Sequence, residues 1–238
     1  MNGPDGSFKQ SPTLRAMLQY AITNRLRLGG GEPERRAALL RQAAYLAALG
    51  IDYLQLREPG LPAGVLVALA REILAILHAH GDRTQLLIHS RPDIAIATRS
   101  DGVHLPSHPG SLTPAQVRSL YTSANLPPPT ISISCHTVDE VARAASLNPD
   151  EAASLILFGP VFEKSVVENC AETRISAGTG LSLLHAACAA AGPTPIVALG
   201  GVTQANAPAC LAAGAAGIAA IRLFLPEATH ATVSHVPA

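Results

Sequence analysis

The side chains best suited to proton transfer near neutral pH are histidines, and several of them follow short runs of β-branched residues. His89 and His104 end two such runs, and His108 follows the second. Zinc ligands have short, fixed spacings that these histidines lack, so a zinc cluster is a minor alternative. We expect His104 to fill the protein core and His89 to contribute to substrate binding.

His136 is the strongest candidate for a general acid or base. It stands beside Ser134 and Cys135 and directly before a predicted helix, which Thr137 and Glu140 can begin with a capping box. The positive end of a helix favours the neutral imidazole, which can accept a proton. We therefore predict that His136 is catalytic and that Ser134 helps to bind the substrate, whereas Cys135 alone is weak grounds for a nucleophile.

Gln55 and Arg57 alternate on one predicted strand, so both side chains face the same side. The planar guanidinium of Arg57 suits a phosphate or a carboxylate. The alternative is that Arg57 pairs with Glu58 or caps the end of the fold. We predict that Gln55 and Arg57 bind substrate.

A second candidate anion site follows two later strands. Gly200 and Gly201 lack side chains, so their backbone N–H groups can approach a ligand closely. Ile221 and Arg222 lie at the end of the next predicted strand and would complete a phosphate cradle. The alternative is that the two glycines form a plain turn.

Composition excludes several classes of function. The formal net charge is +0 and aromatic residues make up 3% of the chain, which disfavours nucleic-acid binding. No apolar run approaches the length of a membrane span, and residues 1–10 lack the apolar core of a secretory signal. The 4 cysteines form no C-x-x-C pair, so we expect a cytoplasmic protein without structural zinc. It could form a homo-oligomer.

The elements that must position these residues alternate between short strands and Ala/Leu-rich helices, a pattern typical of βαβ units. Eight predicted strands lie at 19–23, 51–57, 85–89, 102–105, 130–134, 154–159, 195–201 and 217–222. This number in one domain predicts a single TIM (β/α)8 barrel over residues 19–225; an open doubly wound sheet is the alternative. Residues 1–18 are expected to be an N-terminal extension and 226–238 a flexible tail.

One long segment, residues 159–178, has no helical period. Such a loop inside a compact domain is usually functional or disordered. It follows the sixth strand, so it should cover the catalytic face, where the C-terminal strand ends of a barrel meet.

The motifs, taken in chain order, resemble those of the thiamine phosphate synthase/TenI family. They are YAITNR (20–25), LQLRE (54–58), IHSRPDIAIA (88–97), DGVHLP (101–106), ISCHTVDEVARA (133–144), LFGPVFE (157–163) and PIVALGGVTQANAPACLAAGAAGIAAI (195–221). The resemblance implies a barrel that binds a thiazole phosphate. Synthases of the family join this molecule to a pyrimidine pyrophosphate with magnesium and release pyrophosphate.

The chain departs from the synthase pattern at the positions that handle pyrophosphate. Pro59 stands where synthases carry a lysine, and Ser90 and Pro109 replace the two metal-binding aspartates. The run after Glu163 also lacks a lysine at its usual place, although Lys164 is a neighbouring candidate for substrate binding. Since magnesium needs hard oxygen ligands, we expect no bound metal and no cofactor.

These departures favour the TenI-like branch, whose members resemble metal-independent thiazole tautomerases. The resemblance then implies that His136 is the acid–base group, and Glu163 matches a second position of that branch. The alternatives are a divergent thiamine phosphate synthase with substitute ligands such as Glu58 or Asp93, or a non-catalytic regulator that binds a phosphorylated ligand.

Overall fold

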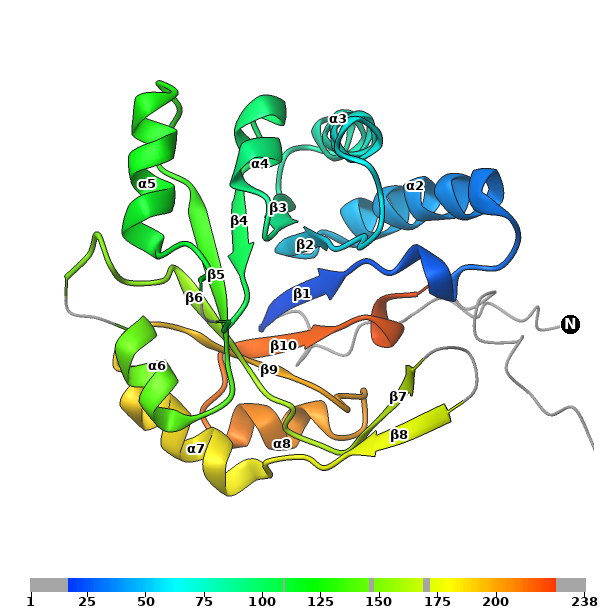
Figure 1. Cartoon of the computed structure of the whole chain (residues 1–238). Helices are drawn as coiled ribbons and strands as arrows, with labels where there is room; N and C mark the ends of the chain where they lie inside the picture. Colours follow the sequence, from blue (N-terminus) through cyan, green and yellow to red (C-terminus); the bar gives the residue numbers. More distant parts are fainter. Residues whose placement is uncertain (1–16, 109, 146–147, 169–171, 226–238) are drawn as a thin grey trace, which may run out of the picture.

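The computed structural model describes residues 17–108, 110–145, 148–168 and 172–225. Eight parallel strands close into a barrel in the order β1-β10-β9-β6-β5-β4-β3-β2 (Figure 1). The strands are β1 (Leu18–Ile22), β2 (Tyr53–Leu56), β3 (Gln85–His89), β4 (Gly102–Leu105), β5 (Thr130–Cys135), β6 (Leu155–Phe158), β9 (Ile196–Leu199) and β10 (Gly217–Ala220). The predicted (β/α)8 barrel is confirmed.

Helices on the outside of the barrel connect successive strands (Figure 1). Two of them begin with capping boxes, in which the side chains of Thr113 and Thr137 accept from backbone N–H groups of Gln116 and Glu140. The helices are α2 (Glu32–Leu49), α3 (Ala63–Ala79), α4 (Pro92–Thr98), α5 (Pro114–Ser123), α6 (Val138–Ala144), α7 (Leu181–Ala190) and α8 (Ala207–Ala212). Short 3-10 helices, η1 (Arg25–Arg27) and η2 (Arg222–Phe224), follow β1 and β10.

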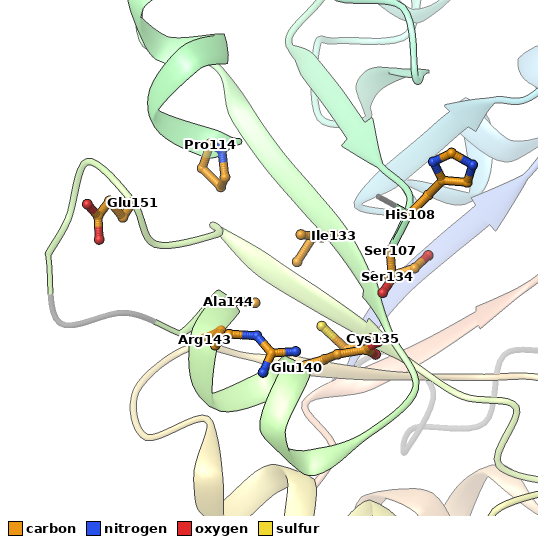
Figure 2. Close-up of a pocket in the computed structure, with 10 residues that line it drawn as sticks. All are labelled: Ser107, His108, Pro114, Ile133, Ser134, Cys135, Glu140, Arg143, Ala144 and Glu151. Carbon is orange, nitrogen blue, oxygen red and sulfur yellow. The ribbon is translucent and has the colours of Figure 1, made fainter. Parts of the chain in front are cut away.

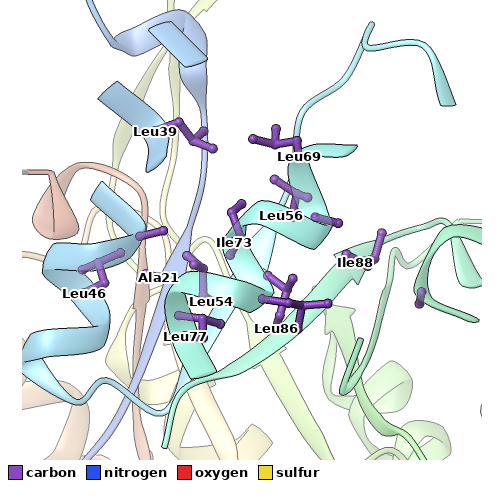
Figure 3. Close-up of a cluster of buried hydrophobic side chains, with 14 of the residues drawn as sticks. Ala21, Leu39, Leu46, Leu54, Leu56, Leu69, Ile73, Leu77, Leu86 and Ile88 are labelled. Carbon is purple, nitrogen blue, oxygen red and sulfur yellow. The ribbon is translucent and has the colours of Figure 1, made fainter. Parts of the chain in front are cut away.

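The core has an outer layer and an inner one, because alternate residues of each strand face opposite sides. Ala21, Leu54 and Leu86 face outward and pack with α2 and α3 (Figure 3). Tyr20 and Leu87 face the barrel axis with residues from the opposite strands. The inward positions therefore lead directly to the mouth of the barrel, where the strands end.

Polar side chains occupy several inward positions in place of the branched apolar residues that usually fill such barrels. Gln55, His104 and Ser132 are 1%, 3% and 0% exposed. Because buried polar groups must be hydrogen-bonded, these residues require partners inside the barrel.

The long segment after β6 contains an antiparallel hairpin, β7 (Lys164–Glu168) and β8 (Glu172–Ser176). The sequence shows only the absence of a helical period here and predicts no strand. Figure 1 shows the hairpin on the side of the barrel toward which β1 points, which is the C-terminal face.

The ends of the predicted domain are only partly visible. Leu18 opens β1 and Met17 is buried against the core, so the barrel begins slightly before residue 19. The predicted extension up to residue 16 and the tail 226–238 lie outside the described residues. Among the helices that the structure describes, none is long and apolar enough to cross a membrane.

Candidate functional site at the barrel mouth

His136 directly follows β5 and is held on two sides. Its ring Nδ1 is hydrogen-bonded to the Gly159 carbonyl at the end of β6, and its backbone N–H donates to the Glu140 carboxylate. A carbonyl can only accept, so Nδ1 carries the hydrogen and a neutral ring keeps its lone pair on Nε2. The exposed ring is therefore oriented as a base through Nε2.

Glu140 is a positioning residue that sequence analysis recognised only as part of a capping box. Burial tends to raise the pKa of its carboxyl, but donors from His136, Ser107 and Thr137 outweigh this and hold the pKa below its usual value. The ionised carboxylate thus ties the start of α6 to the backbone of His136. The sequence pattern of the capping box accounts for Glu140 completely, so nothing in the sequence indicated its second contact, with His136.

His89, at the end of β3, is bound to Gln55 by a hydrogen bond of 2.9 Å between Nδ1 and Nε2. The ring stacks on His104 with centroids 5.4 Å apart. His104 in turn bonds Ser134 through Nε2 at 3.0 Å. Three residues predicted to bind substrate, on β2, β3 and β5, therefore belong to one network. The buried position of His104 agrees with the core role expected from the sequence.

Arg57 follows β2 beside this network and is half-buried. Its backbone N–H donates to Thr23 Oγ1 at 3.0 Å. The alternative partner Glu58 is instead bound to Arg25, at 3.2 Å between Oε2 and Nη1. Within the described part of the chain, the Arg57 guanidinium has no ion-pair partner, so it remains available for an anionic ligand.

The predicted phosphate cradle is formed by the neighbouring ends of β9 and β10. Leu199 pairs with Ala219, so the residues after each strand continue side by side. Among the described residues, no protein acceptor is bonded to the backbone N–H groups of Gly200, Gly201, Ile221 and Arg222. Unpaired N–H groups in such turns form concave anion sites.

The two glycines also have a structural role that sequence analysis missed. Gly200 and Gly201 have φ of +95° and +64°. A Cβ on Gly201 would lie 2.5 Å from the Glu163 carbonyl oxygen and 2.7 Å from Phe162 Cβ. Close packing of the segment after β6 therefore requires glycine here, besides any approach of a ligand.

Substituting Gly201 should reveal this packing. We expect Gly201→Ala to lower the free energy of unfolding by about 1–2 kcal/mol for the left-handed conformation and by a further ~1–3 kcal/mol for the overlap. Gly60→Ala is the matched control, since Gly60 has φ +84° but no atom within 4 Å of a Cβ. Urea unfolding measures both variants. Equal losses would show that the segment after β6 moves away from Gly201 without cost.

The two remaining candidates lie after β6. Glu163 is exposed, with its backbone carbonyl against Gly201. Lys164 opens β7, but its side chain lies outside the described residues. The catalytic role of Glu163 and the binding role of Lys164 therefore stay predictions.

Two cavities lie beside the β4 end of the mouth. One, of about 360 Å³, lies between β5 and α6 and is lined in part by Ser134, Cys135 and Glu140. Figure 2 shows the side chains of Glu140 and Arg143 extending from α6 toward the end of β5. Burial is the main cause that raises the pKa of the Cys135 thiol to about 12, which makes it a poor nucleophile. The other cavity, of about 400 Å³, is lined by residues such as Ser90 and His108.

Comparison with known proteins identifies the family. The sequence model of the family described as thiamine monophosphate synthase matches residues 20–224. The chain belongs to this family. It is 36% identical over 208 residues to a "Putative thiamine-phosphate synthase" of Geobacter sulfurreducens, covering 87% of this chain and 86% of the relative. It is 32% identical over 213 residues to a thiamine-phosphate synthase of Moorella thermoacetica, covering 89% of each chain.

A solved structure supports the fold. The barrel matches the thiamine phosphate pyrophosphorylase of Pyrococcus furiosus with a TM-score of 0.67 over 90% of this chain and 91% of that chain. The sequence identity is 20%, so this likeness concerns the fold alone. The predicted membership of the thiamine phosphate synthase/TenI family is thus confirmed.

The magnesium implied for synthases of the family does not fit the described residues. Ser90 offers a hydroxyl where a carboxylate is expected, and Pro109 lies outside the described residues. The substitute ligands considered from the sequence are bound elsewhere, Glu58 to Arg25 and Asp93 to Arg91.

Proposed function

We propose that the protein is a transferase that joins a thiazole phosphate to a pyrimidine pyrophosphate, forming thiamine phosphate. The observation that carries this proposal is the family match over residues 20–224, with relatives named as thiamine-phosphate synthases. The relatives support this alternative over the isomerase that the departures from the synthase pattern favour.

The mouth of the barrel supports the binding of two anionic groups. The N–H groups near Gly201 and Ile221, which have no acceptor in the described part of the chain, suit the thiazole phosphate. Among the described residues the Arg57 guanidinium has no ion-pair partner, and it stands near the ends of β2 and β3, where pyrophosphate would carry negative charge as it leaves. In this reaction the thiazole nitrogen attacks the methylene carbon of the pyrimidine, and the electron pair of the broken carbon–oxygen bond leaves with pyrophosphate.

A metal-independent thiazole isomerase is the second candidate. It is favoured by His136, whose Nδ1–H bond to Gly159 leaves Nε2 as a proton acceptor. Formation of the carbon–nitrogen bond moves no proton, so the transferase has no evident use for an oriented base. Isomerisation of a thiazole carboxylate phosphate requires one.

Purified protein should be assayed for both reactions, each with and without Mg²⁺. Formation of thiamine phosphate and pyrophosphate from the two substrates would support the transferase. Isomerisation without thiamine phosphate formation would replace it with the second candidate. Binding of thiazole phosphate without either turnover would leave a binding protein and refute both enzymatic assignments.

A further inference from the structure

A single chain of hydrogen bonds runs through the barrel interior from β5 to β3. Ser134 and Ser132 are bonded to the two nitrogens of His104, at 3.0 Å and 2.8 Å. Ser132 Oγ is 2.9 Å from the Tyr20 hydroxyl, which donates to Gln55 Oε1 at 3.0 Å. Gln55 Nε2 then reaches His89 Nδ1.

Every hydrogen bond in this series has its donor on the side of Ser134 and its acceptor on the side of His89. The one hydrogen of Tyr20 is used on Gln55, so Ser132 must donate to Tyr20. Ser132 can then only accept from His104 Nδ1–H. His104 Nε2 consequently accepts from Ser134.

At the other end of the chain, the same logic fixes His89. The Gln55 amide nitrogen can only donate, so His89 Nδ1 accepts and the hydrogen of a neutral ring resides on Nε2. Nε2 has no partner among the residues that the structure describes. His89 is the last residue of β3 and therefore stands at the mouth.

Water cannot readily replace the inner links, which join His104, Ser132, Tyr20 and Gln55. Tyr20 and Ser132 are 0% exposed and Gln55 is 1% exposed. Breaking the direction at one link would leave two donors or two acceptors facing each other in a region without solvent. The direction set at Gln55 is thus transmitted to both ends.

The chain also requires uncharged imidazoles. The charged or titratable groups against the His89 ring are Arg57, directly after β2, and His104 on β4. Burial and then Arg57 lower the pKa of His89 to about 4, and burial and then His89 lower the pKa of His104 to about 3. Both rings are therefore neutral at pH 7.

We propose that this chain of hydrogen bonds makes His89 a specificity-determining residue. His89 presents Nε2–H to the substrate and so selects a hydrogen-bond acceptor at the mouth of β3. Beside Arg57, that acceptor is an oxygen of an anionic group such as a pyrophosphate. A substrate with a donor at this point would meet a second donor. The inference rests on the proposed function only for the presence of a substrate at this mouth.

Nitrogen-15 NMR of histidine-labelled protein tests the direction without any substrate. In the parent protein at pH 7, we expect His89, assigned by the signals lost in His89→Asn, to carry its hydrogen on Nε2. In Gln55→Glu the carboxylate can only accept, so the hydrogen should appear on Nδ1, either in the neutral ring or in an imidazolium. Gln85→Glu is the matched control on β3, because the Gln85 side chain already acts as an acceptor, from Thr130.

Hydrogen on Nδ1 in the parent protein would overturn the proposal, and this result requires no variant to fold. An unchanged tautomer in folded Gln55→Glu would overturn it too, at a pH where the carbon-13 shift of the introduced carboxyl shows that it is ionised and can only accept. Inorganic pyrophosphate tests the acceptor. If calorimetry shows binding, the His89 Nε2–H signal should shift, and binding without a shift would refute His89 as a ligand contact. If pyrophosphate does not bind but His89 has the expected tautomer, the result would count against the proposed function and would support the directed chain of hydrogen bonds.

Discussion

His136→Asn is expected to lower thiazole isomerisation by about 10²- to 10⁴-fold, the usual contribution of a positioned acid or base. The same variant should change thiamine phosphate formation by less than about tenfold, since that reaction moves no proton. Asparagine has a similar size and can still donate to the Gly159 carbonyl, but it has no titratable nitrogen. Steady-state kcat in each assay measures the effect.

His185→Asn is the matched control for this substitution. His185 lies on α7 and its Nδ1 also bonds a backbone carbonyl, that of Ala213, at 3.2 Å. Its replacement should leave both rates unchanged. Isomerisation at the parental rate in His136→Asn would remove His136 from the mechanism, and a large loss of transferase activity would show that it has a role in substrate binding.

Arg25→Met is expected to lower the free energy of unfolding by about 3–5 kcal/mol, because it leaves a buried carboxylate without its cation. The side chains of Arg25 and Glu58 are 11% and 1% exposed. Arg25 also donates from Nη1 to the Pro59 carbonyl at 3.4 Å, so the pair holds the segments after β1 and β2 together. Urea unfolding at pH 7 measures the loss.

The exposed pair of Arg36 and Glu72 provides the control, since these side chains are 37% and 44% exposed. Arg36→Met should cost no more than about 1 kcal/mol, because solvent screens a surface ion pair. Similar losses in the two variants would mean that burial of the Glu58 carboxylate has no energetic consequence.

The sequence determined the features that depend on neighbouring residues. Alternation and β-branched runs placed each barrel strand within two residues of its observed bounds. Thr137 and Glu140, three residues apart, specified the start of α6 and therefore the place of His136. Such patterns are visible because hydrogen bonds and side-chain faces within one element repeat at fixed short spacings.

Only the tertiary structure decided which distant residues meet. Tyr20 bonds Gln55 across 35 positions of the chain and Ser132 across 112, contacts that exist because the barrel closes with one particular register. Alternation could have assigned these side chains to the interior, but not to each other. The fit of Gly201 against Glu163 depends in the same way on how the segment after β6 folds over β9. Local sequence fixes the direction in which a side chain faces, and closure of the barrel fixes its partners.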